Sequence, residues 1–113
     1  MDILERIVDW NKERRLLDSF SADAEYNMLR EELEEFIEAK DENEMIDALC
    51  DIVVVATGAI AKLGYDPVRA MDETIKEISS RRGSFNENTG KWEKDKNQPK
   101  DTLYKANYEQ ARL

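Results

Sequence analysis

The segment from Met45 to Leu63 constrains the fold most, because it is almost entirely apolar and yet is interrupted by acids where it begins. These acids are Glu44, Asp47 and Asp51, at spacings of three and four residues. At about 100° per helical residue they share one arc, while the apolar side chains gather on the other side. The pattern predicts a helix over residues 44–63 with one narrow acidic face.

A second acidic segment lies just upstream, where residues 31–38 hold five glutamates among apolar residues at helical spacing. The link over residues 40–43 is short, so the two helices are predicted to form an antiparallel hairpin. In such a hairpin Glu35 lies beside Asp47, and Glu32 lies near Asp51. Facing rows of carboxylates are costly to bury unless a cation lies between them. The hairpin therefore predicts a metal site.

The residue types present narrow the chemistry of that site. The chain has one cysteine, Cys50, and no histidine. This composition excludes a disulfide framework, a zinc site of the Cys/His type and a nucleophile activated by histidine. It also disfavours a di-iron carboxylate bundle, which generally needs Glu-x-x-His. Oxygen ligands alone favour Mg²⁺, with Mn²⁺ as the alternative, and Mg²⁺ bound by carboxylates commonly serves phosphate chemistry.

The overall charge bears on partners and location. The chain has 113 residues with 26 acidic and 17 basic side chains, a net charge of -9, which disfavours binding to nucleic acid or an anionic membrane. Residues 1–80 hold 21 acids and 9 bases, whereas residues 81–113 hold 5 and 8. We expect one domain, with a helical core over residues 1–82 and a basic C-terminal tail over residues 83–113. No signal pattern or spanning segment is seen, so a cytoplasmic location is expected.

The remaining elements also follow helical spacing. Helices are predicted over residues 3–17, from an N-cap at Ser21 to residue 39, and from Pro67 to residue 80. Beyond Arg82 the pattern indicates loop and then one short helix at the end. Apolar residues also lie outside the main stripe of the segment 44–63, so a second copy of the chain is expected to cover them. The predicted fold is all-α, with four to five helices built around the hairpin, as a homo-oligomer, dimer or tetramer, that completes the bundle.

Two acidic motifs carry a resemblance to a known family. Glu31-Glu32-x-x-Glu35 followed by Glu44-x-x-Asp47 resembles the EExxE and ExxD signature of the all-α nucleoside triphosphate pyrophosphohydrolases, the MazG-like superfamily. The words WNKERRLL, EMIDALCDIVVV, SSRRGSF and GKWEKD are similar to those of small MazG-like proteins of phages and bacteria. The resemblance covers about 85 of the 113 residues.

The resemblance implies hydrolysis of a nucleoside triphosphate to the monophosphate and pyrophosphate. It implies that Mg²⁺ is held by Glu32, Glu35, Glu44 and Asp47, with Glu35 and Asp47 also counted as catalytic. Glu31 or Asp51 is then a candidate base for the attacking water.

Two departures from the family pattern are visible. The gap between Glu35 and Glu44 is short, and Asp51 follows Asp47 at four residues, where some relatives place their key aspartate. Glu44, Asp47 and Asp51 therefore all remain candidate metal ligands.

A triphosphate also needs positive charge from the protein. Arg81 and Lys94 are the preferred substrate-binding residues, with Arg14 next and Trp10 as a possible platform for the base. Gly58 lies on nearly the same helical arc as Asp51, and its missing side chain leaves room for the sugar or the base of a nucleotide.

Other interpretations of the same residues remain open. Glu44 fits the third position of a capping box that begins at Asp41. Asp47 and Asp51 fit surface salt bridges with Arg30 or Lys40. The alternative function is a non-enzymatic helical module that binds metal or nucleotide.

Overall fold

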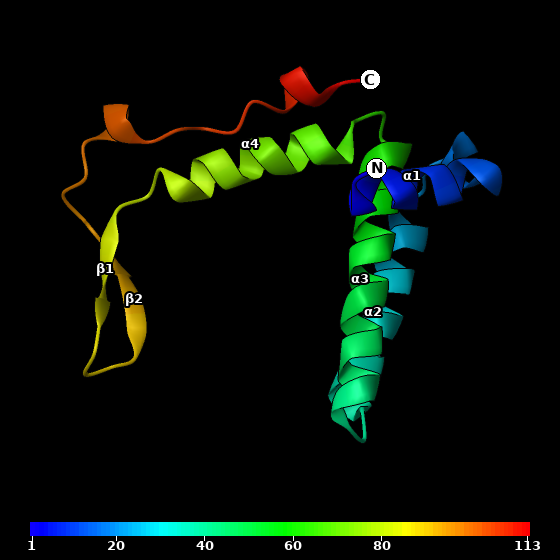
Figure 1. The fold of residues 1–113 in the computed structure, drawn as a ribbon, viewed down its shortest axis with the longest axis horizontal. Coiled ribbons are helices and arrows are strands. Elements are labelled where there is room, and N and C mark those ends of the chain that lie inside the picture. The colour runs from blue at the N-terminus through cyan, green and yellow to red at the C-terminus, as the bar shows by residue number, and fades with distance from the viewer. The chain divides into compact units, whose positions relative to one another are not determined.

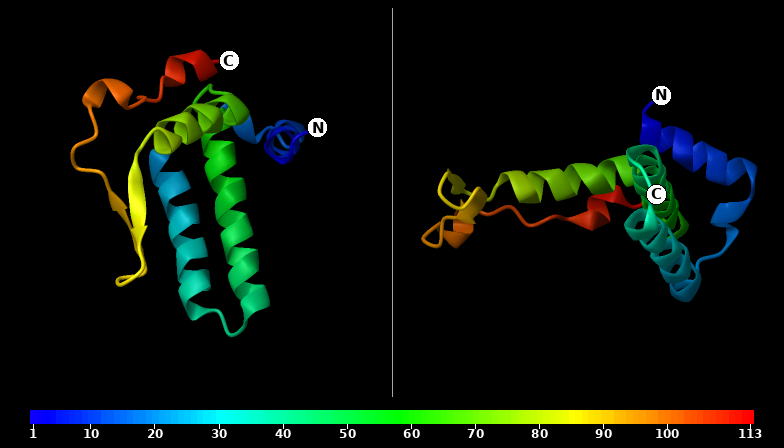
Figure 2. Two further views of the ribbon diagram at one scale, coloured as in Figure 1. Left: turned by 60° about the vertical axis from the view of Figure 1, so that its left-hand side comes forward. Right: turned by 90° about the horizontal axis from the view of Figure 1, so that it is seen from below.

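Two antiparallel helices, α2 (Ala22–Glu38) and α3 (Glu42–Lys62), pack against each other in a computed structural model that describes residues 1–113 (Figures 1 and 2). The Ser21 hydroxyl caps α2 by accepting a hydrogen bond from the amide of Ala24 at 3.3 Å. The Asp41 carboxylate caps α3 by accepting one from the amide of Glu44 at 2.9 Å. Both caps satisfy amides that have no partner within the helix. The predicted helical hairpin is confirmed.

The first of two compact units comprises Met1–Pro67 together with Leu113. Besides the hairpin it contains α1 (Ile3–Glu13), which packs against α3, and a 3₁₀ turn over Leu16–Asp18. The prediction that the first helix reaches residue 17 was wrong. Arg15 takes a left-handed conformation with φ of 57°, which ends the helical path. At the other end of the unit, Gly64 follows Leu63, the C-cap of α3, and has the positive φ of 94° expected at the position after a helix C-cap.

The second unit comprises Val68–Arg112 and includes nearly all of α4 (Pro67–Ser79). Two short antiparallel strands follow, β1 (Gly83–Asn86) and β2 (Lys91–Lys94), with Phe85 opposite Trp92. The prediction of loop in this region was wrong, because the turn itself holds the strands together. The Asn86 side chain accepts hydrogen bonds from the amides of Asn88 and Thr89, and Gly90 adopts a φ of 69°.

The last part of the chain is mostly irregular, with 3₁₀ turns over Lys100–Thr102 and Tyr108–Ala111. The short final helix of the sequence prediction is thus only a 3₁₀ turn. The division into residues 1–82 and 83–113 stays a prediction.

The interior of each unit is small. The buried apolar residues are all alanines, Ala48 and Ala61 in the first unit and Ala70 and Ala111 in the second. No large side chain is fully buried anywhere in the chain. None of the helices combines the length and the apolar character that crossing a membrane requires.

Candidate metal centre

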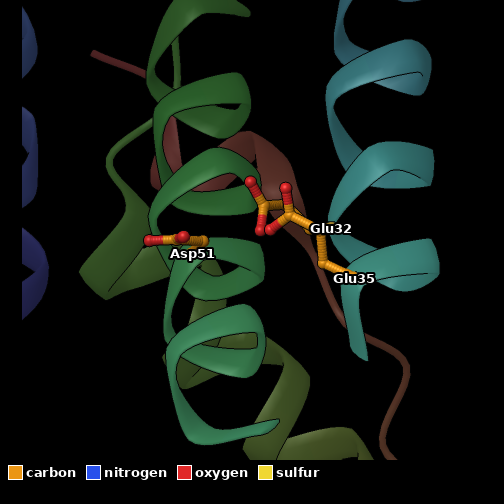
Figure 3. A group of neighbouring side chains, drawn as sticks. All are labelled: Glu32, Glu35 and Asp51. Carbon is orange, nitrogen blue, oxygen red and sulfur yellow. The ribbon is translucent and has the colours of Figure 1, made fainter. Parts of the chain in front are cut away.

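Three carboxylates of the hairpin lie close together. Glu32 and Glu35 reach from α2 toward α3, which carries Asp51 (Figure 3). One carboxylate oxygen from each residue lies within 4.8 Å of the other two. We call Glu32, Glu35 and Asp51 the acid cluster. The spacing of three residues on α2 places its two acids on neighbouring positions of one face.

The surroundings of Glu32 perturb its carboxyl group strongly. Its pKa is raised from 4.5 to about 7, first because burial disfavours the charged form, and then because of a hydrogen bond with Glu35 and the charges of Glu35, Asp51 and Asp47. Its Oε2 atom is buried and has no hydrogen-bond partner. Buried polar atoms are nearly always paired in folded proteins, so this oxygen is available to an additional ligand.

The acid cluster also lacks a protein cation. None of the ion pairs in the structure includes Glu32, Glu35 or Asp51, and the nearby Arg30 pairs with Glu34 instead, at 3.8 Å. Three converging carboxylates with an unpaired oxygen suit a hard divalent cation that takes oxygen ligands. The residues present therefore fit Mg²⁺ or Mn²⁺.

The two other acids of α3 that the sequence singled out have different surroundings. Asp47 is exposed, and its charge contributes to the raised pKa of Glu32, so it lies at the border of the acid cluster. Glu44 belongs to the helix cap. Its carboxylate accepts a hydrogen bond from the amide of Lys40 at 2.8 Å, while its own amide donates to Asp41. This arrangement resembles a capping box and accounts for Glu44 without a metal.

Three more acids of α2 lie outside the acid cluster. Glu31, Glu34 and Glu38 are exposed and are not members of the acid cluster. Cys50, the only cysteine, is exposed beside Asp51 in the sequence.

The predicted substrate-binding residues of α1 lie together. The guanidinium carbon of Arg14, the C-cap residue of α1, lies 4.5 Å from the centroid of the Trp10 ring, so a cation covers one face of the indole. Gly58 faces a different residue of α1. A Cβ at Gly58 would lie 3.2 Å from Oδ1 of Asn11, so this glycine allows a close approach of α1 to α3.

In the second unit, Arg81 and Lys94 line one basic pocket of about 410 Å³. Its cations share the space with a single acid, Asp95; the lining residues are Arg81, Arg82, Lys94, Asp95, Lys96, Gln98, Lys100 and Leu103. The Gln98 side chain accepts a hydrogen bond from the amide of Arg82 at 2.7 Å and donates one to the carbonyl of Ser80 at 2.8 Å, which fixes its position in the pocket. Arg81 also pairs with Glu77 at 3.5 Å.

Sequence reasoning missed one buried polar pair. Glu25 of α2 contacts Lys62 at the end of α3, and only 6% of Glu25 is exposed. The signal available in the sequence was that Glu25 falls on the apolar face of its helix, four residues before Leu29.

Comparison with known proteins gives one match. The sequence model of the phosphoribosyl-ATP pyrophosphohydrolase family matches residues 5–79, a segment that includes the whole hairpin and the acid cluster. This family is part of the MazG-like superfamily of all-α nucleoside triphosphate pyrophosphohydrolases. No curated protein and no solved structure matches the chain.

Proposed function

The chain belongs to the phosphoribosyl-ATP pyrophosphohydrolase family, and on this premise we propose that it is a Mg²⁺-dependent nucleoside triphosphate pyrophosphohydrolase. The products are a nucleoside monophosphate and pyrophosphate. The observation that carries the proposal is the acid cluster, in which three carboxylates converge without a protein cation and one buried oxygen has no partner.

In this proposal Glu32, Glu35 and Asp51 hold the ion. When bound, Mg²⁺ neutralises triphosphate charge and lowers the pKa of a water molecule. Asp47 is exposed at the border of the acid cluster, so we assign it the role of orienting the attacking water and accepting its proton. Glu44 keeps its place in the cap of α3, and Glu31 remains a second candidate base.

Arg81 and Lys94 are proposed as phosphate-binding residues of the second unit. Their pocket holds five cations against one acid, which favours a polyanion. Arg14 and Trp10 are proposed as further contacts, with the second face of the indole free of the Arg14 guanidinium.

Pyrophosphate release is the direct test. A panel of ribo- and deoxynucleoside triphosphates together with phosphoribosyl-ATP is assayed with Mg²⁺, with Mn²⁺ and with a chelator. Glu35→Gln and Asp51→Asn are expected to lower kcat/KM by roughly 100-fold or more, since each removes a proposed metal ligand. Glu38→Gln on the exposed side of α2 is the matched control, and Glu44→Gln is expected to act mainly through helix stability.

Two outcomes contradict the proposal. Turnover that persists in the chelator argues against the metal requirement. Cation binding without turnover of any nucleotide indicates a metal-binding module in place of an enzyme.

A homo-oligomer is part of the proposal. The hairpin leaves large apolar side chains uncovered, with Ile37 79%, Ile46 59% and Val53 49% exposed. A chain of this length that buries no large side chain has too little core to be stable alone. We therefore assign this face to a second copy of the chain.

Analytical ultracentrifugation tests the assembly. The variant Ile46→Ser/Val53→Ser is expected to dissociate and to melt at lower temperature, whereas Asn43→Ala on the same helix is the control. A stable monomer of the unmodified chain at micromolar concentration contradicts the assignment.

A further inference from the structure

One side of the first unit contains a buried ion pair that is separate from the acid cluster. Nζ of Lys62, the last residue of α3, lies 2.5 Å from Oε1 of Glu25 near the start of α2. Only 8% of the Glu25 side chain and 14% of the Lys62 side chain are exposed. Removing both charges from water costs free energy, so a buried ion pair adds little to the stability of the fold. We therefore look for a role of this pair in binding.

Lys62 engages only one oxygen of this carboxylate. Oε2 of Glu25 is buried and has no hydrogen-bond partner. The desolvation of such an oxygen is uncompensated in the free protein. Because Lys62 fixes the carboxylate through Oε1, Oε2 presents an acceptor in a defined position.

Glu25 lines a small cavity between the first three helices. Its volume is about 140 Å³, and its walls are mainly apolar: Trp10, Asn11, Leu16, Glu25, Met28, Val54, Val55, Gly58 and Lys62. Pockets for drug-sized ligands measure about 300–1,000 Å³, so this one has room for a single small ring system.

Asn11 adds a second acceptor to the cavity wall. It is 4% exposed, and its Nδ2 donates to the carbonyl of Ile7 at 2.8 Å, which leaves Oδ1 directed at the Gly58 side. The absence of a side chain at Gly58 makes this position of Asn11 possible. Two acceptors in an apolar cavity favour a flat ring whose edge carries N–H groups.

We propose that Glu25 is a specificity-determining residue, whose Oε2 accepts a hydrogen bond from an N–H group on the base of the nucleotide seated in this cavity. The inference rests on the proposed function, because that function supplies the nucleotide. It adds a rule of selection: bases with an N–H donor at the recognised edge bind, and bases with that edge blocked do not.

The test uses free nucleosides without phosphate or Mg²⁺, so that it does not depend on hydrolysis or on the acid cluster. Binding is followed by the fluorescence of Trp10 in a Trp92→Phe background and by the shift in melting temperature. Each nucleoside is paired with its N-methylated form: uridine with N3-methyluridine, guanosine with 1-methylguanosine, and cytidine and adenosine with their dimethylamino forms.

For whichever nucleoside binds, methylation is expected to weaken binding by roughly 10- to 100-fold, as for loss of a hydrogen bond to a charged group. Equal affinity for both members of every pair overturns the inference. So does the absence of binding by any nucleoside, and this result leaves pyrophosphate release as a separate question.

Glu25→Gln separates recognition from a purely structural ion pair. Lys62 can still donate to the amide oxygen, which turns the amide N–H₂ toward the position of Oε2 and reverses the hydrogen-bond polarity. The ratio of affinities between free and methylated nucleosides is expected to collapse, whereas Glu34→Gln on the exposed side of α2 keeps it. A ratio that is unchanged in Glu25→Gln overturns the inference.

A second variant covers the case in which Glu25→Gln does not fold. Gly58→Ala places a Cβ against Asn11 and narrows the cavity while leaving Glu25 intact, and alanine is a better helix former than glycine. Loss of nucleoside binding in this variant supports the cavity as the binding place. Binding that is unchanged contradicts it.

Discussion

Glu32 in the acid cluster and Glu73 on α4 are both shielded carboxylates, yet their pKa values move in opposite directions. Glu73 is 3% exposed, and its pKa lies below 4.5 because the Tyr104 hydroxyl, the Asn107 amide and Lys76 all donate to it. The corresponding distances are 2.5, 2.8 and 3.4 Å. Glu32 has acids for neighbours and no protein cation, and its pKa is about 7.

The difference matches a structural role for Glu73 and the metal-binding role proposed for Glu32. Glu73 receives two of its three donors, Tyr104 and Asn107, from the irregular C-terminal segment, and Glu77 accepts a further bond from the Ala106 amide at 3.0 Å. These bonds fasten that segment to α4 within the second unit. Glu32 keeps an unsatisfied oxygen, which suits a residue that awaits a cation. A low pKa thus accompanies a structural role here, and a raised pKa accompanies the proposed binding role.

The largest expected effect is on turnover. Glu32→Gln and Glu73→Gln each remove one charge with almost no change in shape. Glu32→Gln is expected to lower kcat/KM for pyrophosphate release by roughly 100-fold or more, because it removes a proposed metal ligand. Glu73→Gln is expected to retain activity within about tenfold, or about 1.4 kcal/mol of barrier. A similar loss of kcat/KM in both variants contradicts the different roles assigned to Glu32 and Glu73.

Stabilisation by Mg²⁺ is the next effect in size. A cation that binds only the folded chain adds about 2.7 kcal/mol at 100 times its Kd. The melting temperature of the unmodified chain and of Glu73→Gln is expected to rise with Mg²⁺, whereas the rise is lost in Asp51→Asn. Scanning calorimetry in a Mg²⁺ salt and in a K⁺ salt at matched ionic strength gives the measurement. A rise of equal size in Asp51→Asn places the cation elsewhere.

The same pair of variants should shift stability in opposite directions when metal is absent. In a chelator at pH 7.5, Glu32→Gln removes repulsion from the acid cluster and is expected to raise the melting temperature. Glu73→Gln weakens the bonds that hold the C-terminal segment and is expected to lower it. Circular dichroism gives the melting temperature of each variant relative to the unmodified chain. Shifts of the same sign in both variants contradict the contrast between the two carboxylates.

The smallest effects appear in the pH dependence of stability without metal. The pKa of Glu32 is raised from 4.5 to about 7, so the folded state holds more protons across this window and stability falls as pH rises through it. The pKa of Glu73 is lowered, so its contribution is complete above 4.5 and is lost as pH falls through the folded value. Denaturant titrations from pH 3 to 8 measure the free energy of unfolding at each pH. In Glu32→Gln its fall between pH 4.5 and about 7 is expected to disappear, and in Glu73→Gln its fall at acid pH is expected to disappear.

Helical periodicity carried most of the fold prediction. The short link between α2 and α3 and the cap at Ser21 could be identified from local sequence, because both depend on neighbouring residues. The β1–β2 hairpin could not, since each strand has only four residues and the turn between them depends on the hydrogen bonds of the Asn86 side chain and the positive φ of Gly90. The early end of α1 depends on a left-handed Arg15, a conformation that non-glycine residues seldom adopt.

Helical periodicity also made part of the candidate site predictable. Glu32, Glu35 and Asp51 follow from the arcs of two neighbouring helices, although their use as metal ligands stays a prediction. Glu25 could not be assigned, because its partner Lys62 lies 37 residues away and the unpaired oxygen is a property of their packing.

The single exposed thiol of Cys50, next in sequence to Asp51, offers a spectroscopic handle. A trifluoromethyl group attached there would report on the acid cluster by ¹⁹F resonance without any cysteine having to be replaced. The number of resonances would carry additional information. One signal indicates that all copies in the assembly are equivalent by symmetry, and two of equal intensity indicate copies in different environments.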